Sequence, residues 1–215
     1  MSNKVLIVVP MKDPTKCKSR LSPRLSSEVR GELALRLFKQ SIRKIRAATK
    51  KLQSPIDLAV VTESLRIQDI CKKDKIKVIR SEEVGCTLSY YLNAAAEWAI
   101  KNNYSAICIL PSDIANPKTK DLVSLLACPI ENNEMVICPA KDLGTNALLI
   151  SPPNGISFSF GKKSFLKHLR LAKKKKIRPV VLPLESIRFD VDVMEDLDAL
   201  PLQYSPFFLK SASNE

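Results

Sequence analysis

The feature of this sequence that most limits its fold is a series of short apolar runs along nearly the whole chain. Most of these runs show little polar alternation, which is typical of strands that are buried on both faces of a sheet. They predict strands at residues 4–9, 56–61, 76–79, 106–110, 135–138, 147–150 and 177–184.

Segments with helical periodicity separate these runs. Ser26 and Thr87 precede two of them and are residue types that cap helix N-termini. The pattern predicts helices at residues 26–45, 64–73, 87–98, 118–126, 164–174 and 194–200. Strands that alternate with helices indicate an α/β fold with a mainly parallel central sheet. We expect one domain over residues 1–200, because no internal repeat or linker interrupts it, followed by a C-terminal tail at 201–215.

Composition narrows the class of protein. The chain has 215 residues, of which 45% are hydrophobic, and its longest N-terminal apolar run covers only residues 5–9. That run is too short for a signal peptide core or a membrane span, so we expect a cytoplasmic protein. The six cysteines include no Cys-x-x-Cys pair and His168 is the single histidine. A zinc site is therefore not expected, and the cysteines are interpreted as free thiols.

The formal net charge of +13 favours anionic partners without choosing among nucleic acid, nucleotides and phosphorylated metabolites. The only dense basic run, residues 173–176, is expected to be a solvated helix end. His168 belongs to the same basic helix, and we expect it at the surface or behind a site residue.

The loop after the first strand is basic but lacks a nucleotide-binding glycine fingerprint. Neither Gly-x-Gly-x-x-Gly nor Gly-x-x-x-x-Gly-Lys-Ser/Thr occurs in the chain. In α/β sheets ligands bind beyond the carboxyl ends of the strands. Four cations in this loop could neutralise a triphosphate there: Lys12, Lys16, Lys18 and Arg20.

Carboxylates follow two later strands. Asp113 comes just after the strand at 106–110, and Asp190 and Asp192 follow the last strand. Mg²⁺ in nucleotide sites takes one or two carboxylates together with phosphate oxygens, so these aspartates are candidate ligands. The alternative interpretation is that each aspartate only caps a loop or a helix.

The run Gly144-Thr145-Asn146 stands before an apolar strand. One interpretation is a turn that leads into a core strand, and the other is a polar cradle for a small anion. A triad hydrolase is disfavoured because no Gly-x-Ser-x-Gly elbow exists. A substrate phosphate, being ionised at neutral pH, could attack a nucleotide α-phosphorus unaided. Catalysis would then need positioning and charge neutralisation.

These residues together resemble the CofC family, the guanylyltransferases of coenzyme F-420 biosynthesis. The resemblance covers nearly the whole chain, and its most specific part is Gly144 to Leu148 with Gly161, Ser164 and Phe165 behind it. Its other marks are residues 9–12 with 18–21, 111–113, His168, 190–192 and 195–197. The resemblance implies a Rossmann-like, GT-A-like nucleotidyltransferase fold, a three-layer sandwich. It also implies transfer of GMP from GTP to the phosphate of 2-phospho-L-lactate, phosphoenolpyruvate or 3-phospho-D-glycerate, with release of pyrophosphate.

The resemblance also implies roles for individual residues. Thr145, Gly161 and Ser164 would hold the phospho-acid, and the free N–H groups at the start of the helix at Ser164 would favour its charge. Magnesium would bind Asp113 and one of Asp190 or Asp192. Lys12, Lys18 and Arg20 would face the GTP phosphates, with Lys18 and Asp113 as the catalytic pair. Two departures from the family pattern are Leu143, where many relatives have glycine, and Ile114-Ala115, where they have Leu-Pro.

Two other functions stay open at this point. A nucleotidyltransferase for a sugar phosphate or a molybdopterin would share most of these features. A basic nucleic-acid-binding protein is disfavoured, because the chain has no aromatic-rich RNA-binding motif. The next enzyme of the coenzyme pathway and a second copy of the chain are the protein partners to consider.

Overall fold

The computed structural model describes residues 4–80, 85–201 and 204. Seven strands form one sheet in the order β3-β2-β1-β4-β6-β5-β7. Their bounds are β1 Val5–Pro10, β2 Ile56–Val61, β3 Lys77–Ile79, β4 Ala106–Ile109, β5 Glu134–Pro139, β6 Thr145–Ser151 and β7 Arg178–Val181. The runs that predicted strands therefore all belong to one sheet.

The sheet is mixed but mostly parallel. β1 pairs in parallel with β2 and β4, β2 with β3, and β5 with β7. Strand β6 alone is antiparallel to both of its neighbours, β4 and β5. The start of β6 therefore lies at the same edge as the carboxyl end of β4, because Ile109 pairs with Leu148 and Ile107 with Ile150.

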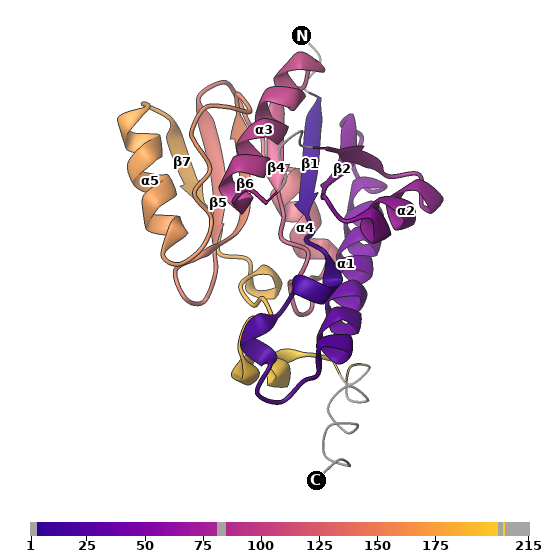
Figure 1. Cartoon of the computed structure of the whole chain (residues 1–215). Coiled ribbons are helices and arrows are strands. Elements are labelled where there is room, and N and C mark those ends of the chain that lie inside the picture. The colour runs from indigo at the N-terminus through magenta and orange to yellow at the C-terminus, as the bar shows by residue number, and fades with distance from the viewer. Residues whose placement is uncertain (1–3, 81–84, 202–203, 205–215) are drawn as a thin grey trace.

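Helices cover both faces of the sheet and make three layers (Figure 1). Val5, Ile7 and Val9 of β1 face a core built with α1, α2 and α4, whereas Leu6 and Val8 face α3 and α5. Strand β1 is thus apolar on both sides, which explains its unbroken apolar run. The helices are α1 Ser27–Thr49, α2 Leu65–Lys73, α3 Leu88–Lys101, α4 Thr119–Leu126 and α5 Ser164–Lys174.

The predicted helix caps are confirmed. Ser26 Oγ accepts from the Val29 N–H at 3.3 Å, and Thr87 Oγ1 accepts from the Tyr90 N–H at 3.3 Å. Each cap satisfies one backbone donor that the first helical turn leaves unpaired, which stabilises the helix by about 1 kcal/mol. The basic run 173–176 is exposed at the end of α5, as expected.

Two predicted elements differ from the structure near the C-terminus. The last strand covers four residues rather than residues 177–184, since Pro183 cannot donate to a ladder. The predicted helix at 194–200 is instead a 3₁₀ helix, η4 (Met194–Ala199), because the segment is short and packs its few apolar residues onto a loop.

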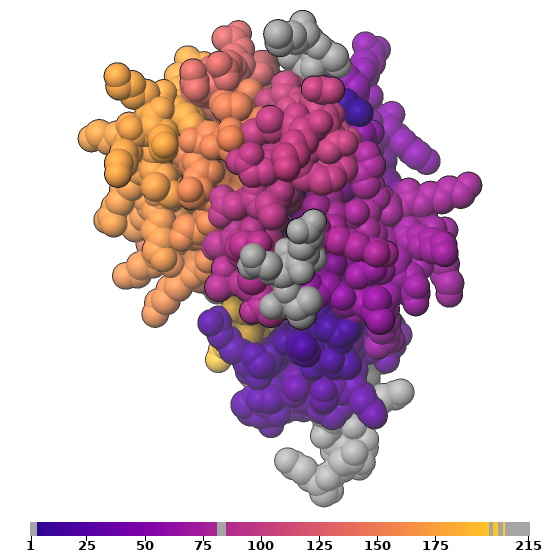
Figure 2. Space-filling model, turned by 45° about the horizontal axis from the view of Figure 1, so that its top comes forward, coloured from indigo at the N-terminus to yellow at the C-terminus, as the bar shows by residue number. Residues whose placement is uncertain are grey.

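That C-terminal segment packs against the N-terminal loop. Leu21 and Leu25 share a buried cluster with Val191 and Leu197, and both segments lie below the sheet in Figure 1. On the surface in Figure 2, part of the yellow C-terminal segment is visible beside the indigo N-terminal loop. Tyr204 is also buried in this cluster and donates to Gln40 Oε1 at 3.2 Å. The rest of the predicted tail, 202–203 and 205–215, lies outside the described residues. Within the described ranges, no helix is long and apolar enough to cross a membrane.

Candidate active site

The site lies where the strand order reverses, between the carboxyl ends of β1 and β4. From β1 the chain passes to β2 and β3 on one side, whereas β4 lies on the other side. Such a switch point leaves a crevice in which α/β sheets bind ligands. A cavity of about 370 Å³ opens here. Its lining includes Lys12, Lys16, Lys18 and Arg20 from the β1 loop, with Ser112, Asp113 and Asp192.

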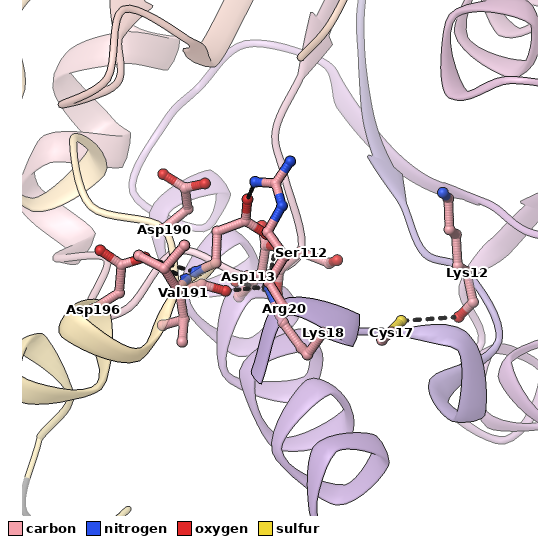
Figure 3. A network of polar contacts seen from close by, with 12 residues as sticks. Lys12, Cys17, Lys18, Arg20, Ser112, Asp113, Asp190, Val191 and Asp196 are labelled. Atoms are coloured by element: carbon pink, nitrogen blue, oxygen red, sulfur yellow. Dashed lines mark hydrogen bonds and ion pairs between the residues drawn. The ribbon is translucent and has the colours of Figure 1, made fainter. Parts of the chain in front are cut away.

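Lys18 connects the loop after β1 to the carboxylates. Its φ of 56° places it in the left-handed region, and its side chain is only 5% exposed. The ammonium group donates to Asp113 Oδ2 and to the carbonyl of Val191 (Figure 3). Burial disfavours this charge. The carboxylate of Asp113, with smaller contributions from Asp192 and Asp190, outweighs burial and raises the pKa of Lys18 above its usual value.

Asp190 is brought to the site by a short backbone pairing. Ile114 and Asp190 form an antiparallel bridge, Val191 N donates to Asp113 O at 3.1 Å, and Ala115 N donates to Phe189 O at 2.8 Å. These bonds hold the loop after β4 beside the C-terminal segment. Burial, and next the negative charge of Asp113, raise the pKa of Asp190 to about 6. The two carboxyl groups are therefore close enough to repel each other.

Asp192 has a different environment from Asp190. It pairs with Arg20, and the side chains of Arg20 and Asp192 are 69% and 47% exposed. Exposed pairs of this kind add little stability. Asp196 accepts from the N–H groups of Asp192 and Val193 at 2.8 Å each, so it orders this turn. Asp192 lines the switch-point cavity together with Asp113, whereas Asp190 is the one whose pKa the charge of Asp113 raises.

The donor chemistry of this cluster suits a divalent cation. Among the described residues no group of three His, Cys, Asp or Glu side chains is already arranged to hold a metal ion. Asp113 and Asp190 nevertheless offer carboxylate oxygens, which are the donors that Mg²⁺ prefers. A cation would relieve the repulsion between the two carboxylates, and the ammonium of Lys18 balances part of their negative charge. The residues present are therefore compatible with Mg²⁺, which Asp113 would hold together with Asp190 or Asp192.

The antiparallel course of β6 brings Thr145 to the same edge of the sheet. Thr145 Oγ1 lies 3.0 Å from His168 Nδ1 and 3.1 Å from Ser164 Oγ, which donates to it. His168 Nε2 accepts from the Ser159 N–H at 3.0 Å, so the ring proton of the neutral imidazole is on Nδ1 and is donated to Thr145. With two donors on its oxygen, the hydroxyl of Thr145 keeps its own proton for another acceptor.

Of the two positions expected for His168, the one at the surface is wrong, and the buried one, behind another residue, is what the structure shows. The residue is fully buried in α5, behind Thr145, because its two ring nitrogens find partners inside the fold. Burial, with a smaller effect of Lys167, lowers the pKa of His168 to about 4. The imidazole is therefore neutral at physiological pH.

This pKa predicts acid sensitivity. Between pH 6.5 and pH 4, His168 is protonated in the unfolded chain but stays neutral in the folded chain. The free energy of unfolding therefore falls as the pH falls. At pH 5 the loss from this group is about 2 kcal/mol. His168→Asn keeps an N–H donor but does not titrate. Urea unfolding at pH 7 and pH 5 should show a smaller decrease for His168→Asn than for the wild type, and equal decreases would contradict the assignment.

The expectation of free N–H groups at the start of α5 needs a correction. Ser164 N donates to Gly161 O at 3.0 Å and Phe165 N donates to Leu143 O at 3.1 Å. Ser164 itself is fully buried. The backbone N–H groups of Ser164 and Phe165 are thus already paired with carbonyls of the preceding turn and of the Leu143 turn. The sequence alone did not predict these two hydrogen bonds.

The turns around this helix end use unusual backbone angles. Gly161 has φ of 115° and no atom within 4 Å of the position of an added Cβ, so space is open above it. Leu143 has φ of 66° and is 44% exposed, which explains why glycine would suit this position. A Cβ on Gly144 would lie 2.8 Å from Asp142 Oδ1, so a larger residue would displace this exposed carboxylate, which accepts from the Gly144 N–H.

Asn146 belongs to the run that was considered as an anion cradle, but no role was predicted for its side chain, which links the two halves of the site. It is buried, and its Nδ2 donates to Ile187 O at 2.9 Å and to Asp190 Oδ1 at 3.1 Å. The amide therefore joins the strand that carries Thr145 to the carboxylate cluster. The signal in the sequence was a polar amide inside an otherwise apolar strand.

The structure thus brings most predicted residues together. Lys18, Arg20, Asp113, Asp190 and Asp192 form one polar network, and Lys12 lies apart from it in Figure 3 while lining the same cavity. A second group joins Thr145 to Ser164, with Gly161 bonded to Ser164 through the backbone. Asn146 connects the two groups.

Comparison with solved structures identifies the fold. A putative nucleotide-diphospho-sugar transferase from Desulfovibrio desulfuricans superposes with a TM-score of 0.68 at 17% identity, covering 99% of this chain and 96% of that one. A 4-diphosphocytidyl-2C-methyl-D-erythritol synthase has a TM-score of 0.60 at 10% identity, over 93% and 97%. A Mycobacterium tuberculosis protein in complex with manganese has a TM-score of 0.54 at 15% identity, over 93% and 98%. The chain therefore has a nucleotidyltransferase-like α/β fold.

Sequence comparisons then identify the family. Residues 5–206 match the family described as guanylyl transferase CofC like. The chain is 38% identical over 200 residues to a 3-phospho-D-glycerate guanylyltransferase of Colwellia psychrerythraea, covering 93% of this chain and 92% of the relative. It is 32% identical over 212 residues to a phosphoenolpyruvate guanylyltransferase of Rubrobacter xylanophilus (94% and 98%). It is 31% identical over 205 residues to a 2-phospho-L-lactate guanylyltransferase of Methanobrevibacter ruminantium (93% and 86%).

The chain belongs to the CofC family of guanylyltransferases. This confirms the resemblance, the α/β nucleotidyltransferase fold and the enzyme class that the sequence predicted. Enzymes of this class typically use a divalent metal, in line with the carboxylate pair.

Proposed function

We propose that this enzyme transfers GMP from GTP to the phosphate of a small phospho-acid, releasing pyrophosphate, as a step of coenzyme F-420 biosynthesis. The acceptor that we propose is 3-phospho-D-glycerate, because the relative that is 38% identical to this chain is named for that acceptor. The observation that best supports two adjoining substrate sites is the Asn146 side chain, which joins the strand of Thr145 to the carboxylate cluster.

The site residues divide between the two substrates. Lys12, Lys18 and Arg20 would neutralise the GTP phosphates, because these cations line the switch-point cavity. On the acceptor side, Thr145 would donate its hydroxyl proton to the phospho-acid, since its oxygen already accepts from Ser164 and His168. Gly161 would leave room for the acid, and Ser164 would act through Thr145 because it is buried.

The reaction needs no protein base in this arrangement. An ionised oxygen of the acceptor phosphate attacks the α-phosphorus of GTP and forms a new P–O bond. The bond between the α-phosphorus and the oxygen that bridges to the β-phosphorus breaks, and pyrophosphate leaves. Mg²⁺, when held by Asp113 and Asp190, would neutralise charge on the phosphates. The chain's own residues supply alignment and cations, which is how phosphoryl and nucleotidyl transfers are chiefly accelerated.

Pyrophosphate release tests the proposal directly. The purified protein is incubated with GTP, Mg²⁺ and each of 3-phospho-D-glycerate, phosphoenolpyruvate and 2-phospho-L-lactate, and the GMP adduct is identified by mass spectrometry. We expect the highest kcat/KM with 3-phospho-D-glycerate. Higher kcat/KM with another acid would refute the choice of acceptor, and no product with any of the three would refute the function.

A different nucleotidyl acceptor is the second candidate, favoured by the structural likeness to a putative nucleotide-diphospho-sugar transferase. The same assay with sugar 1-phosphates and molybdopterin in place of the phospho-acids separates the two. Product with these acceptors alone would support this candidate over the first.

Thr145→Val should affect mainly the acceptor. The substitution removes the hydroxyl but keeps the side-chain shape, so we expect the KM for the phospho-acid to rise about 10- to 100-fold with the KM for GTP nearly unchanged. Thr145→Ser, which keeps the hydroxyl, is the matched control and should stay near the wild type. A change confined to the KM for GTP would contradict the role of Thr145.

A further inference from the structure

A second cavity, of about 610 Å³, adjoins the first at the carboxyl ends of β1 and β2. The roles proposed above use none of its lining except Lys12. Residues that line both cavities are Pro10, Met11, Lys12, Lys16 and Leu88. Residues that line only the second include Thr62, Glu63, Leu65, Cys86 and Tyr91. Two cavities that share two lysines can be spanned by one ligand whose anionic part lies near those lysines.

The second cavity presents apolar surface that the fold does not use. Leu65 is 76% exposed, the highest value among the large hydrophobic side chains that the structure describes. It is the first residue of α2, where the preceding Ser64 is buried. Leu88, at the start of α3, also lines this cavity and is only partly buried. An exposed leucine inside a concave site is well suited to cover one face of a flat, apolar ring.

Two carboxylates line this cavity, Asp13 and Glu63, and Asp13 accepts hydrogen bonds on both of its oxygens. Asp13 accepts from both the backbone and the hydroxyl of Thr15 and from the hydroxyl of Ser64. Glu63 stands two residues after the end of β2 and is exposed. Within the described part of the chain its carboxylate accepts one bond, from Gly85 N at 3.1 Å to Oε1. Glu63 therefore keeps acceptor capacity for a ligand.

The edge of guanine complements such a carboxylate. Guanine presents the N1–H and N2–H donors side by side, and a carboxylate can accept from both, whereas adenine presents an unprotonated N1 that a carboxylate repels. We propose that the cavity beside Glu63 binds the guanine base of GTP, with Glu63 accepting from N1–H and N2–H and with Leu65 covering the ring. This assignment rests on the proposed function, in which GTP phosphates occupy the adjoining cavity.

Glu63→Gln tests the assignment by an exchange of hydrogen-bond partners. The amide keeps one acceptor for N1–H but places an N–H₂ group opposite the guanine amino group, so kcat/KM for GTP should fall about 10- to 100-fold. Xanthine has a carbonyl in place of that amino group, so the variant should use xanthosine triphosphate at least tenfold better than the wild type does. Nucleotide affinity measured by calorimetry should change in the same sense.

Two controls support the interpretation of this test. Glu32→Gln, an exposed carboxylate on α1 outside both cavities, should leave the use of GTP and of xanthosine triphosphate unchanged. Leu65→Ser should raise the KM for GTP and for inosine triphosphate by similar factors, because the ring face is common to both, and should leave the acceptor KM unchanged. Wild-type enzyme should prefer GTP to inosine triphosphate, which lacks the amino group.

The outcomes separate this inference from the proposed function. If the wild type turns over GTP while Glu63→Gln keeps the same kcat/KM for GTP and gains nothing with xanthosine triphosphate, the guanine assignment is wrong and the function stands. A well-folded wild type that fails with GTP and every phospho-acid overturns the function and the guanine assignment with it.

Discussion

Replacing Asp113 by asparagine is expected to lower kcat by about two to three orders of magnitude. The charge of Asp113 acts on the neighbouring Asp190, and Asp113 accepts from the buried ammonium of Lys18. The amide keeps the shape but loses the charge, so it binds a divalent cation more weakly and leaves Lys18 with less compensation. Pyrophosphate release at saturating substrates measures kcat, and titration with Mn²⁺ measures cation affinity without turnover.

Asp190 and Asp192 provide an internal comparison for this prediction. Asp190→Asn should weaken Mn²⁺ binding about as much as Asp113→Asn does, since the charge of Asp113 acts on the carboxyl group of Asp190. Asp192→Asn should have a smaller effect, because Asp192 is half-exposed and pairs with Arg20. Asp69→Asn, on the exposed side of α2, controls for a general change of charge. Near-normal turnover of Asp113→Asn would remove Asp113 from the metal site.

Lys18→Met is expected to lower kcat/KM by about 100-fold or more, because the buried cation that pairs with Asp113 is removed from the phosphate cavity. The same substitution should have the opposite effect on cation binding. In the wild type without nucleotide the ammonium of Lys18 balances Asp113 and Asp190, and a divalent cation must compete with it. We therefore expect the Lys18→Met variant to bind Mn²⁺ more tightly in the absence of nucleotide while turning over more slowly.

Lys18→Arg is the matched control for charge. Arginine keeps the cation, but its planar fork does not replace an ammonium that bonds one carboxylate and one carbonyl in a buried space. We expect Mn²⁺ affinity close to that of the wild type and only partial recovery of turnover. Full activity of Lys18→Met would exclude Lys18 from catalysis. Weaker Mn²⁺ binding by that variant would exclude competition between the ammonium and the cation.

The local elements of this fold were predictable because their causes are local. Apolar runs long enough for one strand, such as residues 56–61, predict β2 with the bounds that the structure shows. The hydroxyls of Ser26 and Thr87 cap the helices that they were expected to cap. Near the C-terminus the predictions were less accurate. There the chain forms the exposed edge strand β7 and the 3₁₀ helix η4, whose limits depend on packing against distant segments.

The candidate site was only partly predictable. Lys18 and Asp113 follow parallel strands, and the general rule for parallel sheets indicated that they meet. The backbone pairing that places Asp190 and Val191 beside Ile114 and Asp113, and the burial of His168 behind Thr145, depend on contacts between segments that are far apart in sequence. The role of Asn146 has the same origin, since its partners are Ile187 and Asp190.

The sequence by itself determined which segments become strands and helices, the basic loop after β1, and the residue types that the chemistry requires, because periodicity and side-chain chemistry are properties of neighbouring residues. Only the tertiary structure decided that β6 runs antiparallel. In a parallel strand Thr145 would start at the edge opposite Asp113, and the Gly144 turn would be no more than a turn before a core strand. Because β6 pairs antiparallel with β4 and β5, its first residues lie at the edge of the sheet where Lys18 and Asp113 lie. The group around Thr145 therefore adjoins the group around Asp113.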